Sequence, residues 1–171
     1  MQNSKHPLVL ALFTSPTTAI TAARALRNLG VPHERVSIVA RSHDEESVIA
    51  RASGASPGSE LEDSLTASRI GELSAHFLSA MALVMPGIGP IVADGPLAAR
   101  LAEAAGHAAG GVARALERSG LTPSDAEEWA GEITKGAILV GAHVDVDGVT
   151  AARHVLTAAG PDRIAQVDWS D

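Results

Sequence analysis

Residues 68–118 constrain the fold most, because a rigid turn there separates two segments that are rich in small apolar residues. The turn is Pro-Gly-Ile-Gly-Pro at 86–90, between the segments 77–85 and 97–115. Apolar residues recur near helical spacing in both segments, and small residues recur every fourth position in the second. Small residues at that spacing let two helices approach closely. We therefore expect residues 65–120 to form a hairpin of two helices.

Two similar segments flank this hairpin, and each is predicted to form a β-α-β unit. The expected strand, helix and strand lie at 8–14, 16–29 and 36–40, and again at 137–144, 148–159 and 164–169. The two helices share Thr-Ala-Ala-Arg at 21–24 and 150–153, and each ends in Gly, then Pro, then an Arg that introduces a strand. The same elements in the same order indicate an internal duplication.

The duplication predicts a fold class. Two such units with right-handed crossovers can interleave into one four-stranded antiparallel sheet with helices on one face, which is the ferredoxin-like arrangement. Roughly ninety residues separate the second and third strands, so this connection must carry structure of its own. We predict an α+β fold, a ferredoxin-like four-stranded sheet from two β-α-β units with a long Gly/Ala-rich helical hairpin inserted between strands two and three. The single domain 1–171 divides into a first unit at 7–41, a polar acidic loop at 42–64, the hairpin at 65–120, and a helix plus the second unit at 122–171.

Capping residues define several expected helix ends. Ser15 can cap a helix that opens at Pro16, where the missing N–H loses no hydrogen bond. Thr-Pro-Ser-Asp at 122–125 predicts the start of another helix, which ends at the Lys-Gly pair 135–136. Asp147 is the expected cap of the last helix.

Composition and charge exclude several function classes. The net charge is −7 and no basic stripe is present, which argues against a nucleic-acid partner. The chain has no cysteine, so we expect no disulfide, no thiolate nucleophile and no cysteine-based metal site. A cytoplasmic location fits this composition. The apolar run after Lys5 allows a signal peptide as the alternative, but the duplication favours a strand at 8–14.

The hairpin is too interrupted for membrane insertion. A spanning helix needs about 20 apolar residues, whereas the longest run, 77–93, is shorter and is broken by the Pro-Gly turn. Charged residues also recur along the second segment. We expect a soluble hairpin whose apolar faces are buried against a second copy, so that residues 68–118 form a homo-oligomer interface. Association with a membrane surface is the alternative.

One set of residues could hold a metal. Glu72 and His76 lie four residues apart on the first expected helix, and Glu103 and His107 lie four apart on the second. Counted from Pro90, the two pairs are level to within roughly one turn, and helices packed roughly 8–10 Å apart could bring them together. Two carboxylates and two imidazoles suit iron, manganese or zinc. The set therefore predicts a metal or heme site at these four residues.

Other interpretations of these residues stay open. The second pair could lie on a solvated stripe with Arg100 and Arg114, and the first pair likewise. His76 and His107 inside an interface could instead sense pH. The other five histidines are dispersed in the sequence. Gly-Ala-Ser-Pro-Gly at 54–58 matches the spacing of a nucleophile elbow but lacks the strand before it and the helix after it, so we predict no catalytic residue.

Four stretches carry a resemblance to a known family. They are Leu-Gly-Val-Pro at 29–32, Val-Ser-Ile-Val-Ala-Arg at 36–41, Met-Pro-Gly-Ile-Gly-Pro at 85–90 and Ala-Asp-Gly-Pro-Leu-Ala at 93–98. With these motifs the chain resembles, over 8–168, the bacterial general stress proteins, also called the heat- or low-temperature-induced stress protein family and mostly a domain of unknown function. The resemblance implies no catalytic residues and, in many members, a hairpin called membrane-associated. We therefore expect a non-enzymatic, stress-associated protein that self-assembles.

Overall fold

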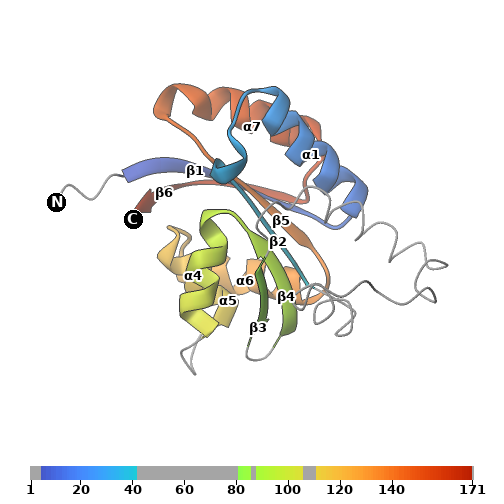
Figure 1. The fold of residues 1–171 in the computed structure, drawn as a ribbon, viewed down its shortest axis with the longest axis vertical. Helices are drawn as coiled ribbons and strands as arrows, with labels where there is room; N and C mark the ends of the chain where they lie inside the picture. The colour runs from blue at the N-terminus through green and yellow to red at the C-terminus, as the bar shows by residue number, and fades with distance from the viewer. Residues whose placement is uncertain (1–4, 42–80, 86–87, 106–110, 171) are drawn as a thin grey trace.

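A computed structural model describes residues 5–41, 81–85, 88–105 and 111–170. These residues contain one sheet of six strands in the order β3-β4-β2-β5-β1-β6, with every neighbouring pair antiparallel (Figure 1). The strands are β1 (Lys5–Phe13), β2 (Val36–Arg41), β3 (Met81–Met85), β4 (Gly89–Asp94), β5 (Ile138–His143) and β6 (Arg163–Ser170). The helices are α1 (Pro16–Asn28), α4 (Pro96–Ala105), α5 (Gly111–Arg118), α6 (Pro123–Thr134) and α7 (Val149–Ala158), with short 3-10 turns η1 (His33–Arg35) and η3 (Val146–Gly148).

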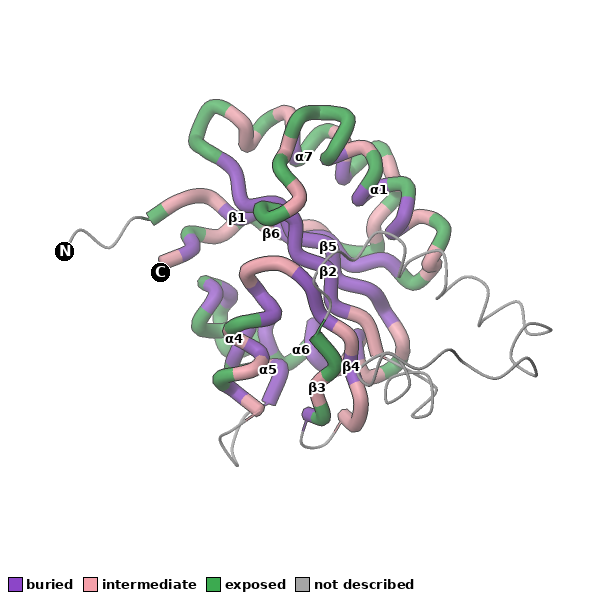
Figure 2. Tube along the Cα trace, in the orientation of Figure 1, coloured by how far each residue is buried: buried purple, intermediate pink, exposed green. Residues whose placement is uncertain are grey.

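Helices cover both faces of the sheet (Figure 1). Leu8, Leu10 and Leu12 of β1 point to the cluster formed with α4, α5 and α6, while the alternate residues of β1 point to the cluster formed with α1 and α7. Buried residues therefore run through the middle of the molecule (Figure 2). Burial on both faces explains why residues 8–13 of β1 are a continuous apolar run in the sequence. The strand interpretation of residues 8–14 is confirmed.

The predicted ferredoxin-like sheet of four strands with helices on one face is wrong. The described sheet has six strands, because residues 81–85 and 89–94 form the antiparallel pair β3 and β4, and β4 pairs with β2. For these residues the sequence pattern predicts the end of one helix and a turn. Short runs of Ala, Val, Leu and Ile satisfy both helical and strand spacing. The open edge of β2 decides between them, since pairing there buries Ile91 and Ala93.

The second helix of the predicted hairpin is also wrong. The structure places two helices, α4 and α5, within the segment expected to be one. Arg100 on α4 donates a hydrogen bond to the backbone carbonyl of Arg118 at the end of α5. In one continuous helix those residues would be about 27 Å apart along the axis. The two helices therefore fold back on each other, and the described residues within 65–120 do not form the simple pair of helices that we expected.

The expected N-caps of α1 and α7 differ in detail from the observed ones. Ser15 occupies the N-cap of α1, and Pro16 opens that helix, but the Ser15 side chain makes no capping hydrogen bond. Instead, its backbone carbonyl accepts a bond from Thr18 Oγ1 at 2.9 Å. Asp147 lies within η3, and Gly148 takes the N-cap position of α7. The positions of these helix starts were therefore predictable to within one or two residues, while the capping atoms were not.

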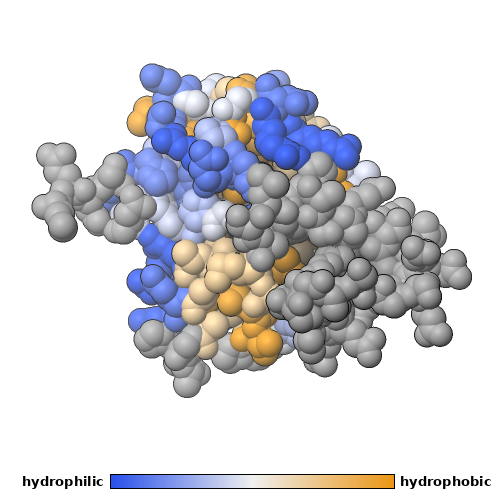
Figure 3. Space-filling model, viewed as in Figure 1, coloured by the Kyte–Doolittle hydropathy of each residue, from blue (hydrophilic) through white to orange (hydrophobic). Residues whose placement is uncertain are grey.

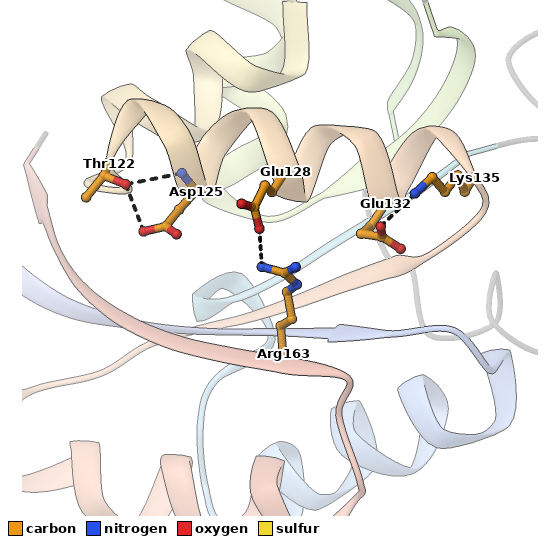
Figure 4. Close-up of polar contacts among 6 residues, drawn as sticks. All are labelled: Thr122, Asp125, Glu128, Glu132, Lys135 and Arg163. Atoms are coloured by element: carbon orange, nitrogen blue, oxygen red, sulfur yellow. Dashed lines mark hydrogen bonds and ion pairs between the residues drawn. The ribbon is translucent and has the colours of Figure 1, made fainter.

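The predicted start of α6 is confirmed, as Figure 4 shows. Thr122 Oγ1 accepts a hydrogen bond from the backbone N–H of Asp125 at 3.1 Å and donates one to its Oδ2 at 2.8 Å. On the same helix, Glu128 pairs with Arg163 at 2.6 Å and Glu132 pairs with Lys135 at 2.9 Å. Both pairs are substantially exposed, so we expect little stability from them.

Replacing Thr122 by alanine removes a backbone cap and is expected to lower the free energy of unfolding by about 1 kcal/mol. Lys135→Ala, which breaks only an exposed ion pair on the same helix, should cost no more than about 0.5 kcal/mol. Urea unfolding of the two variants measures the difference. Equal losses would show that the Thr122 cap adds nothing beyond a surface contact.

Candidate functional site

Three members of the predicted metal set, Glu72, His76 and His107, lie outside the described residues. Glu103 lies on α4, where its Oε2 is 3.2 Å from Arg118 Nη1 and its side chain is 60% exposed. No group of three potential metal ligands is found among the residues that the structure describes.

The helical-hairpin geometry that predicted this metal set is not what the described residues around Pro90 form. It assumed two helices joined by a short turn centred at Pro90, whereas Pro90 lies in strand β4 and is opposite Val84 of β3. The iron, manganese, zinc or heme site at Glu72, His76, Glu103 and His107 stays a prediction, now without the level alignment that motivated it. The serine motif at 54–58 likewise lies outside the described residues.

A buried polar cluster joins residues that the sequence shows as dispersed. His143 on β5 is 2% exposed. Its Nδ1 lies 3.1 Å from His6 Nε2 on β1, and its Nε2 lies 3.2 Å from Ser37 Oγ on β2. Sequence reasoning missed this cluster. The available signal was the duplication, because the equivalent strands β1 and β5 pair antiparallel with Leu8 opposite His143.

Ser37, His143 and His6 lie in the order of a serine nucleophile, its general base and a third group that orients the base. Ser37, however, is 0% exposed. Its Oγ also accepts a hydrogen bond from the backbone N–H of Leu97 at 3.1 Å, which ties the first turn of α4 to β2. A nucleophile must reach a substrate atom, and this hydroxyl is enclosed. We therefore interpret Ser37 as a structural residue that positions α4.

Trp169 closes the same cluster from β6. Its ring is 4% exposed, and its centroid is 4.7 Å from that of His143 in an edge-on arrangement. The guanidinium of Arg100 lies 3.7 Å above the Trp169 ring and donates hydrogen bonds to the carbonyls of Arg118 and Ser170. These contacts hold α4, the end of α5 and the end of β6 together. The cluster is thus a polar joint inside the fold.

The outer strand β3 exposes apolar side chains on the surface. Its five residues are Met-Ala-Leu-Val-Met and carry no charge. Val84 is 74% exposed and Met81 is 40% exposed. Within the described residues β3 pairs with β4 alone, so its other edge faces away from the sheet. Figure 3 shows hydrophobic surface where β3 and β4 lie.

The opposite edge of the sheet has a different character. β6 exposes Arg163, Gln166 and Asp168 along its length. Charged side chains on an edge strand discourage pairing with another chain, and proteins commonly protect their edges in this way. No such protection is present on β3, nor on any residue of 81–93, although the whole chain carries a net charge of −7. The β3 edge is therefore the candidate interaction site.

Comparison with protein family models, curated proteins and solved structures finds no match. The resemblance to the general stress proteins rests on the four sequence motifs and stays a prediction. Among the described helices, none has the length and apolar character needed to cross a membrane.

Proposed function

We propose that this chain is a non-enzymatic, stress-associated cytoplasmic protein that assembles into homo-oligomers through the β3 edge. The uncharged, exposed apolar edge strand is the observation that carries the proposal. It lies within residues 68–118, where the sequence places the assembly surface, but the surface is a strand edge and not a helical hairpin. The sequence motifs support the stress setting, and the absence of cysteine supports a reducing compartment.

Energetics favour association at this edge. An exposed edge strand presents backbone N–H and C=O groups that a second strand can satisfy. Burying one valine side chain contributes roughly 1.5–3 kcal/mol, and in a symmetric pair Val84 is buried twice. The rest of the surface carries the excess negative charge, which disfavours contact between two identical chains elsewhere. An uncharged edge is where two copies approach with least repulsion.

A matched pair of valine substitutions tests the proposal. Val84→Lys places a charge on the β3 edge, and we expect it to weaken self-association by at least about 100-fold, since two buried valines are lost. Val146→Lys is the control, because Val146 is 76% exposed and follows β5, which is separated from β3 by β2 and β4. Light scattering after gel filtration measures the mass of each variant.

The expected masses are a multiple of 17.4 kDa for the wild type and for Val146→Lys, and 17.4 kDa for Val84→Lys. Circular dichroism checks that the variants keep the wild-type fold. A wild-type protein that stays monomeric at tens of micromolar overturns the proposal. So does a Val84→Lys variant that is folded and keeps the wild-type mass.

A further inference from the structure

The backbone of β3 has a defined direction of hydrogen bonding. The carbonyl of Met85 accepts a bond from Ile88 N at 3.1 Å, on the side of the turn that leads into β4. In an antiparallel ladder, the residues that exchange bonds with one neighbour alternate along the strand. Met81, Leu83 and Met85 therefore direct their backbone groups to β4, and Ala82 and Val84 direct theirs to the outer edge.

The residue opposite Val84 supports this assignment independently. Val84 is opposite Pro90 in the β3–β4 register. Proline has no backbone N–H, so it cannot complete a pair that exchanges both bonds. If Val84 and Pro90 form a non-hydrogen-bonded pair, Val84 directs neither its N–H nor its C=O toward β4, and the missing N–H of Pro90 has no effect. The N–H and C=O groups of Val84 accordingly point outward, as the alternation predicts.

From this geometry we infer that two copies of the chain pair β3 with β3, antiparallel about a twofold axis at Leu83, to form one continuous sheet. The inference rests on the proposed function, because it specifies how the β3 edge binds its second copy. In this register Ala82 lies opposite Val84 of the other copy. Each of the two Ala82–Val84 pairs exchanges both backbone bonds, and Leu83 meets its own counterpart in a non-hydrogen-bonded pair.

The side-chain faces agree with the same register. Residues directly opposite in an antiparallel pair lie on the same face. Met85 is 1% exposed and Leu83 packs against the cluster under α4, so Met81, Leu83 and Met85 share the core face. Pairing about Leu83 sets Met81 against Met85 of the other copy on that face. The hydrophobic clusters of the two copies then become continuous.

The opposite face gains an apolar strip. Ala40, Val92 and Ala82 are adjacent across β2, β4 and β3. Val84, next to this strip, is 74% exposed, and the pairing sets it against Ala82 of the second copy. A register shifted by one residue would pair core-facing with solvent-facing side chains and mismatch the backbone bonds. A shift by two residues leaves a shorter overlap of two five-residue strands.

A second copy of this chain is the occupant that the charges favour. The segment 81–93 carries no charged residue in a chain of net charge −7, so two acidic chains meet here without direct repulsion. A twofold contact also needs a self-complementary surface. Met-Ala-Leu-Val-Met meets that need, because reversing it about Leu83 sets an apolar residue opposite an apolar residue at every position.

Cysteine cross-linking tests the register directly, because the chain has no native cysteine. The Cα atoms of a non-hydrogen-bonded pair are about 4.5 Å apart, which is within the range of about 4.4–6.8 Å for disulfides. We expect Leu83→Cys to form a disulfide dimer on mild oxidation. Val146→Cys, exposed and remote from β3, measures collisional cross-linking. Non-reducing gels and intact mass spectrometry report the products.

A second cross-linking experiment mixes two variants and leaves Leu83 unchanged, because Leu83 is partly buried and contributes to the core. Differently tagged Ala82→Cys and Val84→Cys chains should form mixed disulfide dimers several-fold faster than either variant forms its own dimer. If both arms give only the collisional level while light scattering shows a wild-type dimer, the register is wrong and the proposed function stands. Faster homodimer formation by Val84→Cys than by Leu83→Cys also overturns the register. A monomeric wild type overturns both proposals.

Discussion

Replacing Gly95 by alanine is expected to lower the free energy of unfolding by more than about 3 kcal/mol. Gly95 joins β4 to α4 with a φ of +78°. An L residue in that region costs roughly 1–2 kcal/mol. A Cβ there would also lie 2.2 Å from the carbonyl oxygen of Val36 and 2.8 Å from Ser37 Cα. Both are backbone atoms of β2, which cannot move without breaking the sheet.

Two other glycines separate the causes of this loss. Gly30 has a φ of +96° and open space around an added Cβ, so Gly30→Ala should cost only the backbone strain of about 1–2 kcal/mol. Gly131 lies inside α6 with open space, so Gly131→Ala should stabilise the protein by about 0.5–1 kcal/mol. Denaturant unfolding followed by fluorescence of Trp129 and Trp169 measures all three. Equal losses for Gly95→Ala and Gly30→Ala would contradict the close approach of the β4–α4 junction to β2.

Truncating Trp169 to alanine is expected to cost about 3–5 kcal/mol, the range for a buried aromatic residue. The ring fills the space between the end of β6, His143 and the guanidinium of Arg100. Its removal leaves a cavity beside the His6–His143 contact and frees the end of β6 from α4. Because Trp129 remains as a buried fluorophore, the unfolding transition of the variant can still be followed.

Trp169→Phe is the matched control, since it keeps an aromatic face for Arg100 and fills much of the same volume. We expect it to lose much less than half of the stability lost in Trp169→Ala. Chemical unfolding of both variants at one pH makes the comparison. A loss below about 1 kcal/mol in Trp169→Ala would show that this joint does not anchor β6.

Local signals in the sequence were sufficient for most of the elements. The apolar run at 8–14 became β1, and the Thr-Pro-Ser-Asp signal at 122–125 became the start of α6. Pro16 opens α1, as the Ser-Pro pair at 15–16 predicts. These elements depend on burial of one segment and on caps that lie within three residues of the helix start, so neighbouring residues determine them.

The β3–β4 hairpin was not predictable in this way. The only charged side chain in β3 and β4 is Asp94, which is 3% exposed and so marks no solvent face, and helix and strand bury the apolar residues equally well in a short segment. The candidate site was missed for the same reason, since an edge strand exists only where a sheet ends. Sequence patterns predict an assembly surface within 68–118, but only strand pairing shows that β3 is the outer strand of the described sheet.

The buried polar cluster of His6, Ser37 and His143 likewise depends on contacts between residues that are distant in the sequence. His6 and His143 are separated by 137 positions, and strand pairing brings their rings together. Arg100 reaches Trp169 because α4 covers the end of β6. The sequence by itself determined elements such as β1, α1 and α6, because their starts depend on nearby side chains and backbone caps. Tertiary structure alone decided the strand order, the fold-back of α5 on α4 and the place of β3 as the outer strand among the described residues, because contacts between distant segments set them.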